Sequence, residues 1–422
     1  MNTLKELKTF IILWLTQALS SLGSSMTGFA LVIWLYNDSG SALTTALLTV
    51  CSYAPYVIVS IFAGAISDKW NKKAVMLVCD SFAALTTVCI LVLFKTNSLE
   101  VWHLYILNAL NGLMNSVQSP ASDVATTLLT PEKHYQKTSA MRYFSTSLVS
   151  ILTPVLAAAI VSFAGLDAVI SFDLATFAVA FTVLLFFIKI PEVPQNESSK
   201  ETLFQSAKGG ISYLGRNKGI LCMILFLSAI NFIASIYNAA LPALILSKSD
   251  EAALGAVSSS VGIATLVGSV IATVFPKPKS RSKTICACLL VSMSTENFLL
   301  AFGNNTIAWC IGAVLGWLFI PLMSANYDVI FRSTVPKEML GRVYSVRNTL
   351  QFFSIPVGYF LGGFLVDKVF EPFMAGTENT LLLNIFGTEK GSGAALLFFV
   401  IGIAGVIVCA VFSRIKALRE LG

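Results

Sequence analysis

Residues 64–73 read GAISDKWNKK and end the second of twelve apolar stretches in this 422-residue chain. Gly64 would allow two helices to approach closely inside a bilayer. Asp68 falls at a helix end, where it can pair with a base or cap the N-terminus of a neighbouring helix. The basic residues Lys69, Lys72 and Lys73 can anchor the loop at lipid headgroups. This stretch predicts a short hydrophilic turn between two membrane-spanning helices.

The apolar stretches on both sides of this turn are long enough to cross a membrane. A helix needs about 20 mostly apolar residues to span roughly 30 Å of hydrocarbon. The chain has 56% apolar and 12% charged residues, which is enough for twelve such helices. We expect them to begin near positions 9, 42, 74, 101, 138, 168, 218, 252, 281, 306, 343 and 393. The sequence therefore predicts an all-helical, multi-pass membrane protein.

The basic residues are distributed unevenly between the loops. If both termini are cytoplasmic, all 28 Lys and Arg residues fall on the cytoplasmic side except Lys95, Lys248, Lys368 and Lys390. Basic loops remain on the side from which helices insert. We therefore expect a bacterial inner-membrane protein with both termini in the cytoplasm. The net charge of +6 reflects these loops and gives no support for nucleic-acid binding.

The longest cytoplasmic segment divides the chain near its middle. Residues 189–200 (KIPEVPQNESSK) have the composition of a linker. Apolar residues at helical spacing follow between Leu203 and Leu214, which indicates an amphipathic helix on the membrane surface. We expect a six-helix bundle over residues 1–190, a linker with this helix over residues 191–217, and a second six-helix bundle over residues 218–422.

The two halves repeat a loop pattern. Pro131 precedes Arg142 after the fourth span by the same separation at which Pro336 precedes Arg347 after the tenth. Six spans repeated once are typical of secondary transporters, whose substrate site lies where the repeats meet. The repeat predicts two bundles that rock about a central cavity.

Two spans carry polar side chains at the spacing i, i+3, i+7, i+10, so each set lies on one helix face. They are Asn108, Asn111, Asn115 and Gln118 in the fourth span, and Ser228, Asn231, Ser235 and Asn238 in the seventh. Amides that face lipid are costly, so these faces must meet protein or water. They either line the central cavity, which we favour, or form hydrogen bonds between packed helices.

Amides and aromatic rings with little net charge suit a neutral or weakly charged substrate. The predicted cavity residues are Gln17, Asn108, Asn111, Asn115, Asn231, Phe232, Asn238, Trp317 and Tyr327.

Residues 64–73 resemble the signature of the major facilitator superfamily, G-x-x-x-D-(R/K)-x-G-(R/K)-(R/K), with Asn71 in place of the second glycine. Further stretches are similar to the macrolide-efflux branch of its drug:proton antiporters: SYAPY at 52–56, Asp80, SPA at 119–121, RNKG at 216–219, LGRVYS at 340–345 and PVG at 356–358. The resemblance covers nearly the whole chain. It implies two pseudo-symmetric six-helix bundles and export of a hydrophobic or amphipathic molecule by proton antiport with alternating access.

The same resemblance implies a gating role for the loop residues. They are Gly64, Asp68, Lys69, Lys72, Lys73, Arg142, Gly341, Arg342 and Arg347. The chain departs from the family pattern where Asn111 stands in the place of a fourth-span arginine, and where the fifth-span motif is reduced to the surroundings of Pro154. Both departures weaken the expectation of proton antiport.

Proton coupling requires an ionisable group that each side of the membrane can reach in turn. Glu296 is our first candidate because it is the deepest acid in its span, although ninth helices commonly lie at the periphery of this fold. Asp80 and Asp123 are alternatives that could instead form salt bridges with Arg142 or other bases. Asp173 lies near the outer end of its span, where it could simply be hydrated.

Other classes of function find little support. The cysteines and histidines lack metal-site spacing, and there is no Gly-rich phosphate loop. We expect no enzyme, metal or cofactor, with a proton gradient as the driving force. The expected partners are a small molecule, protons and membrane lipid, and we expect a monomer. A lysolipid or siderophore transporter and a transport-inactive sensor remain alternatives. Residues 371–393 form either a surface loop with an apolar patch or a lid.

Overall fold

The computed structural model describes residues 6–131, 134–191, 211–274, 276, 278–335, 340–419 and 421. Within these ranges all regular elements are helices. Each long helix begins within a few positions of a predicted start. The prediction of an all-helical chain is confirmed.

Six long helices make up the described part of the first half. They are α2 (Lys8–Ser39), α3 (Ala42–Lys69), α4 (Lys72–Lys95), α5 (Val101–Leu128), α6 (Tyr135–Ala164) and α7 (Leu166–Phe186). Asn71 caps α4, because its side chain accepts a hydrogen bond from the Ala74 N–H at 3.1 Å. Gly165 turns the chain between α6 and α7 with a φ of +81°, which only glycine adopts without strain.

The second half consists of six further spans, of which two are interrupted. The four uninterrupted spans are α9 (Lys218–Lys248), α10 (Glu251–Val274), α11 (Arg281–Phe302) and α18 (Ser392–Arg414). One interrupted span consists of α12 (Thr306–Trp317) and α13 (Ile320–Thr334), and the other consists of α14 (Leu340–Phe352), α15 (Ser354–Phe364), the π-helix η3 (Leu365–Phe370) and α16 (Glu371–Gly376). The short helices α17 (Thr380–Phe386) and α19 (Lys416–Arg419) complete the described part. Pro321 and Pro356 lie just inside α13 and α15. Proline lacks a backbone N–H, which explains the interruptions.

Eleven of the described helical segments are long and apolar enough to cross a membrane. Helix α5 is the predicted span that is not among them, although it has 28 residues. Its polar stripe lowers its mean hydropathy. Such a helix is tolerated in a membrane where its polar face meets protein or a cavity.

The chain divides into two compact units. The first contains Met1–Trp34 and Cys51–Lys200, and the second contains Leu35–Val50 and Glu201–Gly422. The end of α2, the turn after it and the start of α3 therefore belong to the second unit. In each unit, we call the end with the predicted cytoplasmic bases the basic end. It carries Lys72 and Lys73 in the first unit, and Arg281 and Arg414 in the second.

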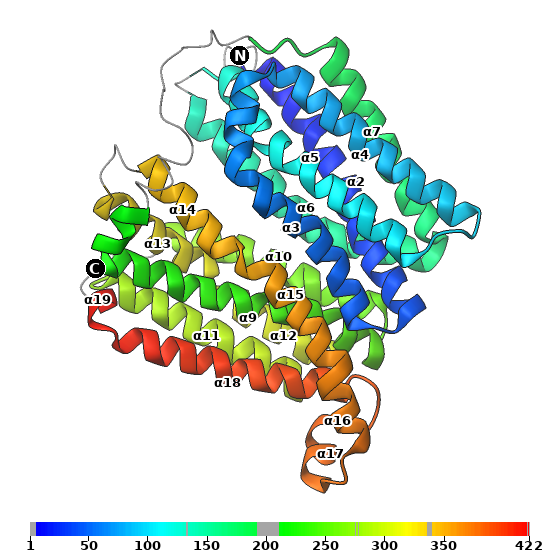
Figure 1. Cartoon of the computed structure of the whole chain (residues 1–422), viewed down its shortest axis with the longest axis vertical. Helices are drawn as coiled ribbons and strands as arrows, with labels where there is room; N and C mark the ends of the chain where they lie inside the picture. Colours follow the sequence, from blue (N-terminus) through cyan, green and yellow to red (C-terminus); the bar gives the residue numbers. More distant parts are fainter. Residues whose placement is uncertain are drawn as a thin grey trace. The chain divides into compact units, whose positions relative to one another are not determined.

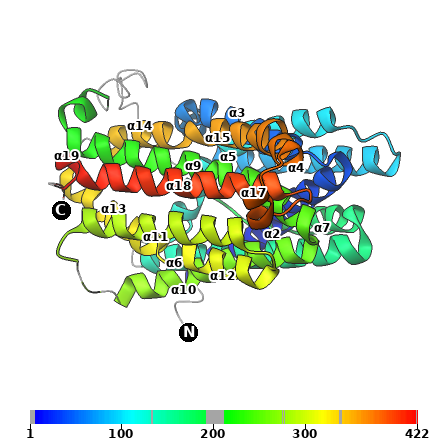
Figure 2. The same cartoon turned by 90° about the horizontal axis from the view of Figure 1, so that it is seen from below.

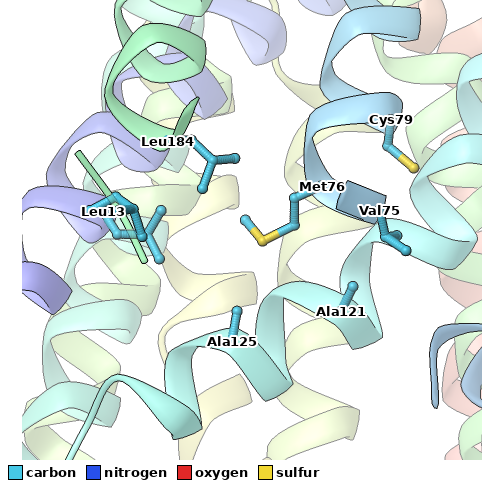
Figure 3. Close-up of a cluster of buried hydrophobic side chains, with 8 residues drawn as sticks. Leu13, Val75, Met76, Cys79, Ala121, Ala125 and Leu184 are labelled. Atoms are coloured by element: carbon cyan, nitrogen blue, oxygen red, sulfur yellow. The ribbon is translucent and has the colours of Figure 1, made fainter. Parts of the chain in front are cut away.

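A buried apolar cluster joins four helices near the basic end of the first unit (Figure 3). Its members are Leu13 of α2, Val75, Met76 and Cys79 of α4, Ala121 and Ala125 of α5, Leu184 of α7, and Ile188 just after α7. The two alanines leave room for the long Met76 side chain, which is fully buried. Gln17 and Asp80, described next, lie one helical turn beyond Leu13 and Met76 of this cluster.

Glycines allow helix backbones to touch in both units. A Cβ atom at Gly112 of α5 would meet the carbonyl oxygen of Ser52 in α3. A Cβ atom at Gly268 of α10 would likewise meet the carbonyl oxygen of Leu318 between α12 and α13. These crossings follow the small-residue packing typical of membrane helices.

Helices α9, α11 and α18 run side by side in the second unit (Figures 1 and 2). Phe226 of α9 stacks on Phe412 of α18 with ring centroids 4.9 Å apart. Farther along the same two helices, the ring of Tyr237 contacts the ring of Phe398 edge to face, with ring centroids 5.4 Å apart. Phe226 and Phe398 are fully buried, so this pair of helices forms a large part of the unit's core.

Candidate functional site

A cavity of about 610 Å³ lies in the first unit and is lined by helices α2 to α7. Small-molecule sites typically have volumes of about 300–1,000 Å³. Polar residues of α2 and α5 form much of the lining, among them Gln17, Ser21, Ser24, Asn108, Asn111, Asn115, Gln118 and Ser122. All four cavity residues predicted for this half, Gln17, Asn108, Asn111 and Asn115, thus face one cavity.

The carboxylate of Asp80 lies at the end of the cavity nearest the apolar cluster. Asp80 follows Met76 by one helical turn, and Gln17 follows Leu13 in the same way. Gln118 Nε2 donates a hydrogen bond to Asp80 Oδ1, and Gln17 lies beside the same carboxylate. Amides from α2 and α5 therefore surround this acid on α4.

Another carboxylate, that of Asp173 in α7, lines the same cavity with 4% of its surface exposed. Ser24 Oγ of α2 donates a hydrogen bond to Asp173 Oδ1 at 2.9 Å. Gly23 makes this approach close enough, because a Cβ atom there would lie 2.9 Å from Asp173 Cα. Gln17 and Ser24 are separated by about 10 Å along α2 at 1.5 Å per residue. Asp80 and Asp173 therefore meet the cavity at different depths.

The asparagines of α5 have different environments along the cavity wall. Asn111 Oδ1 accepts a hydrogen bond from Thr86 Oγ1 of α4 at 2.9 Å. Asn108 Nδ2 donates to the Leu104 carbonyl of its own helix at 2.9 Å, and Asn115 is exposed. Asn111, which stands where the family pattern has an arginine, thus links two helices of the wall.

Two buried polar atoms of the lining have no hydrogen-bond partner among the described residues. They are Gln17 Nε2 and Thr27 Oγ1. Buried polar groups in proteins nearly always have a partner. Gln17 lies beside Asp80, and Thr27 lies beside Asp173.

Asp123 and Arg142 form an ion pair at the cavity lining. Asp123 Oδ1 of α5 accepts from Arg142 Nη2 of α6, and both side chains are about half exposed. Of the roles considered for Asp123, the structure thus shows the salt bridge.

Glu296 of α11 lies inside the helix packing of the second unit, with 3% of its surface exposed. Trp317 Nε1 donates a hydrogen bond to Glu296 Oε1 at 2.9 Å. The carboxylate fills the space beside Gly316, where a Cβ atom would lie 2.5 Å from Glu296 Oε2. Tyr237, which is buried, lies next to the same group. Trp317, which was predicted to line a cavity, therefore binds the Glu296 carboxylate through its indole N–H.

The predicted residues of α9 also belong to the second unit. Asn231 and Phe232 are partly buried, whereas Asn238 is exposed and donates to the Ala234 carbonyl at 2.8 Å. Helix α15 packs closely here, since a Cβ atom at Gly358 would lie 2.7 Å from the Phe232 carbonyl oxygen.

Tyr327 of α13 is buried and contacts α14. Its hydroxyl accepts a hydrogen bond from Gln351 Nε2 at 3.2 Å. The guanidinium of Arg347 lies 5.3 Å from the Tyr327 ring centroid and pairs with Asp328 at 3.9 Å. Arg347 thus joins the two helices at the basic end of this unit.

The predicted gating residues are described only in part. Lys73 Nζ donates to the carbonyls of Leu185 and Ile188 at 2.9 and 2.8 Å, which ties α4 to the end of α7. Lys72 is partly buried. The side chains of Asp68, Lys69 and Arg342, the surroundings of Gly64 and Gly341, and residues 192–210 of the predicted linker lie outside the described part of the structure.

The apolar patch in residues 371–393 lies on the short helix α17. Asn379 Oδ1 caps this helix by accepting from Leu381 N at 3.0 Å. Leu381 is 72% exposed, whereas Phe386 is buried and stacks near Phe302 with centroids 6.0 Å apart. The patch is thus a surface feature anchored at one end.

Other lining residues were not predicted, among them four on α3, α4 and α7. They are Ser52 and Tyr56 of α3, Thr87 of α4 and Phe177 of α7. None of these four belongs to a polar stripe, so the sequence holds no periodic signal that could have identified them.

Comparison with known proteins places these features in a family. The model of the Major Facilitator Superfamily matches residues 13–359. Macrolide efflux protein A of Streptococcus pyogenes is 23% identical over 366 residues, which cover 85% of this chain and 90% of that protein. Enterobactin exporter EntS of Salmonella typhimurium is 22% identical over 352 residues, covering 81% of this chain and 82% of that protein.

A solved structure shares the fold. The crystal structure of a mutant of the nucleoside transporter NupG superposes with a TM-score of 0.75 at 13% identity, covering 95% of this chain and 100% of that chain. Together with the family match over most of the sequence, the helical architecture leads to one conclusion: the chain belongs to the major facilitator superfamily and is a multi-pass membrane transporter.

Proposed function

We propose that this transporter exports a hydrophobic or amphipathic small molecule by alternating access, driven by proton influx. The observation that carries the proposal is the 610 Å³ cavity of the first unit, which combines neutral amides with two carboxylates. Its volume suits a small molecule. Its amides, hydroxyls and the rings of Tyr56 and Phe177 suit a substrate with both polar and apolar parts.

The geometry favours Asp80 and Asp173 over Glu296 as proton carriers. Both aspartates line the cavity, and Asp80 is partly exposed there. Glu296 instead fills the space beside Gly316 and accepts from Trp317 within the helix packing. An acid that exchanges protons during transport must become accessible from each side. A substrate that displaces Gln118 from Asp80, or Ser24 from Asp173, would change the environment of that carboxylate. Substrate binding would thereby be coupled to protonation of the carboxylate.

A macrolide-like substrate is supported by the relatives named macrolide efflux protein A. The test is accumulation of a labelled macrolide in cells that lack their own pumps. We expect the wild-type chain to lower accumulation, and a protonophore to abolish this effect. Asp80→Asn and Asp173→Asn should each reduce export roughly tenfold or more, as expected for functional acids within a membrane.

The matched control is Asp167→Asn, which removes an acid from the same helix as Asp173. Asp167 is 41% exposed and pairs with Lys95 at 3.6 Å, so export should be unchanged. Loss of export in Glu296→Gln, with normal export in both cavity variants, would reverse the assignment of the proton carrier. Export that persists without a proton gradient would exclude antiport.

An enterobactin-like siderophore is a second candidate substrate, because relatives named enterobactin exporter match 81% of the chain. Secretion of the siderophore by a strain without its own exporter would distinguish it from a macrolide. A lysolipid would instead be revealed by altered membrane lipid composition with unchanged drug tolerance. Absence of substrate-dependent proton flux across all three classes in reconstituted vesicles would favour the sensor.

A further inference from the structure

The sequence contains a second copy of the G-x-x-x-D-K pattern. The first copy runs from Gly64 to Lys69 at the end of α3, and the second runs from Gly363 to Lys368 across α15 and η3. Both glycines precede their aspartates by four residues, so each pair shares one helix face. The second copy lies at the end of its span opposite the basic end, which the charge pattern predicts to be outside the cell.

The carboxylate of Asp367 binds the N-terminus of α3 within the second unit. Its Oδ1 accepts from Ala42 N at 3.0 Å, and its Oδ2 accepts from Leu43 N at 2.8 Å. Ser41 Oγ also donates to Oδ2 at 2.5 Å, and itself accepts from Thr44 N at 3.1 Å. The first three N–H groups of a helix have no partner in their own helix. Asp367 and Ser41 together satisfy all three.

Gly363 brings the two helices close enough for this contact. A Cβ atom at Gly363 would lie 2.6 Å from Leu43 Cα and 2.8 Å from the Ala42 carbonyl oxygen. Any side chain at this position would therefore push α3 away from Asp367. The π-helix η3 carries Asp367 itself, and such irregular turns are common at functional positions.

Neighbouring contacts hold the same hairpin. Tyr36 donates to the Ala243 carbonyl at 3.1 Å and lies 2.7 Å from Ser247 Oγ of α9. Asn37 Nδ2 donates to Glu251 Oε1 of α10 at 2.8 Å. These contacts explain why Leu35–Val50 belongs to the second unit, although the rest of α2 and α3 belongs to the first.

We propose that Asp367, Gly363 and the N-terminus of α3 form a latch that keeps this end of the transporter closed until the α2–α3 hairpin is released. A carboxylate at a helix N-terminus is stabilised by charge-assisted hydrogen bonds and by the helix dipole. Separation of the hairpin from η3 would break all three bonds to Asp367. The latch depends on neither the substrate nor the proton carrier proposed above.

The test measures access to the cavity rather than transport. A single reporter cysteine replaces Ser21, which is exposed in the cavity lining, in a chain whose eight native cysteines are substituted. Intact cells are treated with a membrane-impermeant maleimide, and the labelling rate is measured. Asp367→Asn keeps an acceptor but removes the charge, so labelling should rise roughly tenfold. Gly363→Ala should act in the same direction.

Two control variants distinguish loss of the latch from a general loss of stability. Glu371 is one turn from Asp367 and caps α18 in the same manner, accepting from Gly391 N and Ala394 N at 3.1 Å. Glu371→Gln should therefore lower thermal stability without changing the labelling rate. Asp38→Asn removes an exposed acid from the same hairpin and should change neither quantity.

A cross-link keeps the proposal testable if Asp367→Asn folds poorly. The Ser41→Cys/Asp367→Cys pair, joined by a short thiol cross-linker, should abolish labelling from outside, and a reductant that cleaves the linker should restore it. Labelling in the cross-linked protein at the uncross-linked rate would overturn the proposal. Equal labelling of wild type and a well-folded Asp367→Asn would overturn it as well. Because neither readout needs export, failure of the proposed function leaves these outcomes unaffected.

Discussion

The cavity wall of the first unit and the interior of the second unit use similar groups in different ways. Asp80 and Asp173 meet amides and a hydroxyl at the surface of a cavity. Glu296 meets an indole N–H within close helix packing. Each acid has a hydrogen-bond donor, so donors alone do not distinguish them. Access to the cavity does, and this is why we assign proton exchange to the first unit.

The polar stripes of α5 and α9 likewise have similar side chains in different surroundings. Their spacing is identical, and both have Ser or amide side chains. The stripe of α5 faces the cavity. In α9, Ser228 Oγ donates to the Leu350 carbonyl at 3.0 Å, and Ser235 lies against Gly358. Part of the α9 stripe thus serves helix packing, the alternative that periodicity could not exclude.

The largest effect on stability is expected from a substitution that forces apart two helices of the cavity wall. Gly112→Ala places a methyl group against the Ser52 carbonyl, where backbone cannot yield. We expect a loss of about 3 kcal/mol in stability, at the upper end for overpacking. Fluorescence-detected gel filtration after heating would measure it. Gly28→Ala is the control, since nothing lies within 4 Å of a Cβ atom there. Equal melting of both variants would show that the α3–α5 crossing tolerates separation.

Removal of the indole donor in the second unit should have the next largest effect. Trp317→Phe removes the indole hydrogen bond to the buried carboxylate of Glu296. The expected cost is about 2 kcal/mol in stability, because a buried acceptor loses its partner. Trp102→Phe removes a similar indole–carboxylate bond at an exposed site, to Glu100 at 2.7 Å, and should cost little. A Trp317→Phe protein as stable as wild type would indicate that Glu296 has another strong donor.

Chemical modification compares the acids directly. A water-soluble carbodiimide should modify Asp80, which is partly exposed, roughly tenfold faster than Glu296, because a fully buried group reacts only after local opening. Asp173 lines the cavity but has only 4% of its surface exposed, so its rate should lie between these two. Peptide mass spectrometry after short exposure would give the three rates. Comparable rates for all three acids would remove the distinction between the cavity wall and the second unit.

The smallest effect is expected at the exposed ion pair of the cavity lining. Asp123→Asn and Arg142→Gln should each change stability by at most about 1 kcal/mol, since both side chains are about half exposed. A double-mutant cycle in thermal unfolding would measure the coupling. A coupling well above this value would mean that the pair is shielded from water during most of the transport cycle.

Much of the fold could be read from the sequence. The apolar stretches predicted every long helix, because hydrocarbon requires long, internally bonded apolar helices. Asn108, Asn111 and Asn115 were predicted as cavity residues from helical periodicity, and they line a cavity together with Gln17. Periodicity shows which residues share a face, but it does not show what that face meets. The roles of Trp317 and Tyr327 were therefore not predictable in this way.

The amino-acid order was sufficient for the helical class and the spans, since both depend on local hydropathy and spacing. Sequence similarity then established the family. Which acids line the cavity, and which helix end Asp367 binds, emerged only when the helices were assembled. Asp367 and Ser41 are 326 residues apart, and their contact depends on the close approach at Gly363. Local sequence patterns do not reveal contacts between residues so far apart in the chain, because such contacts depend on how whole helices pack.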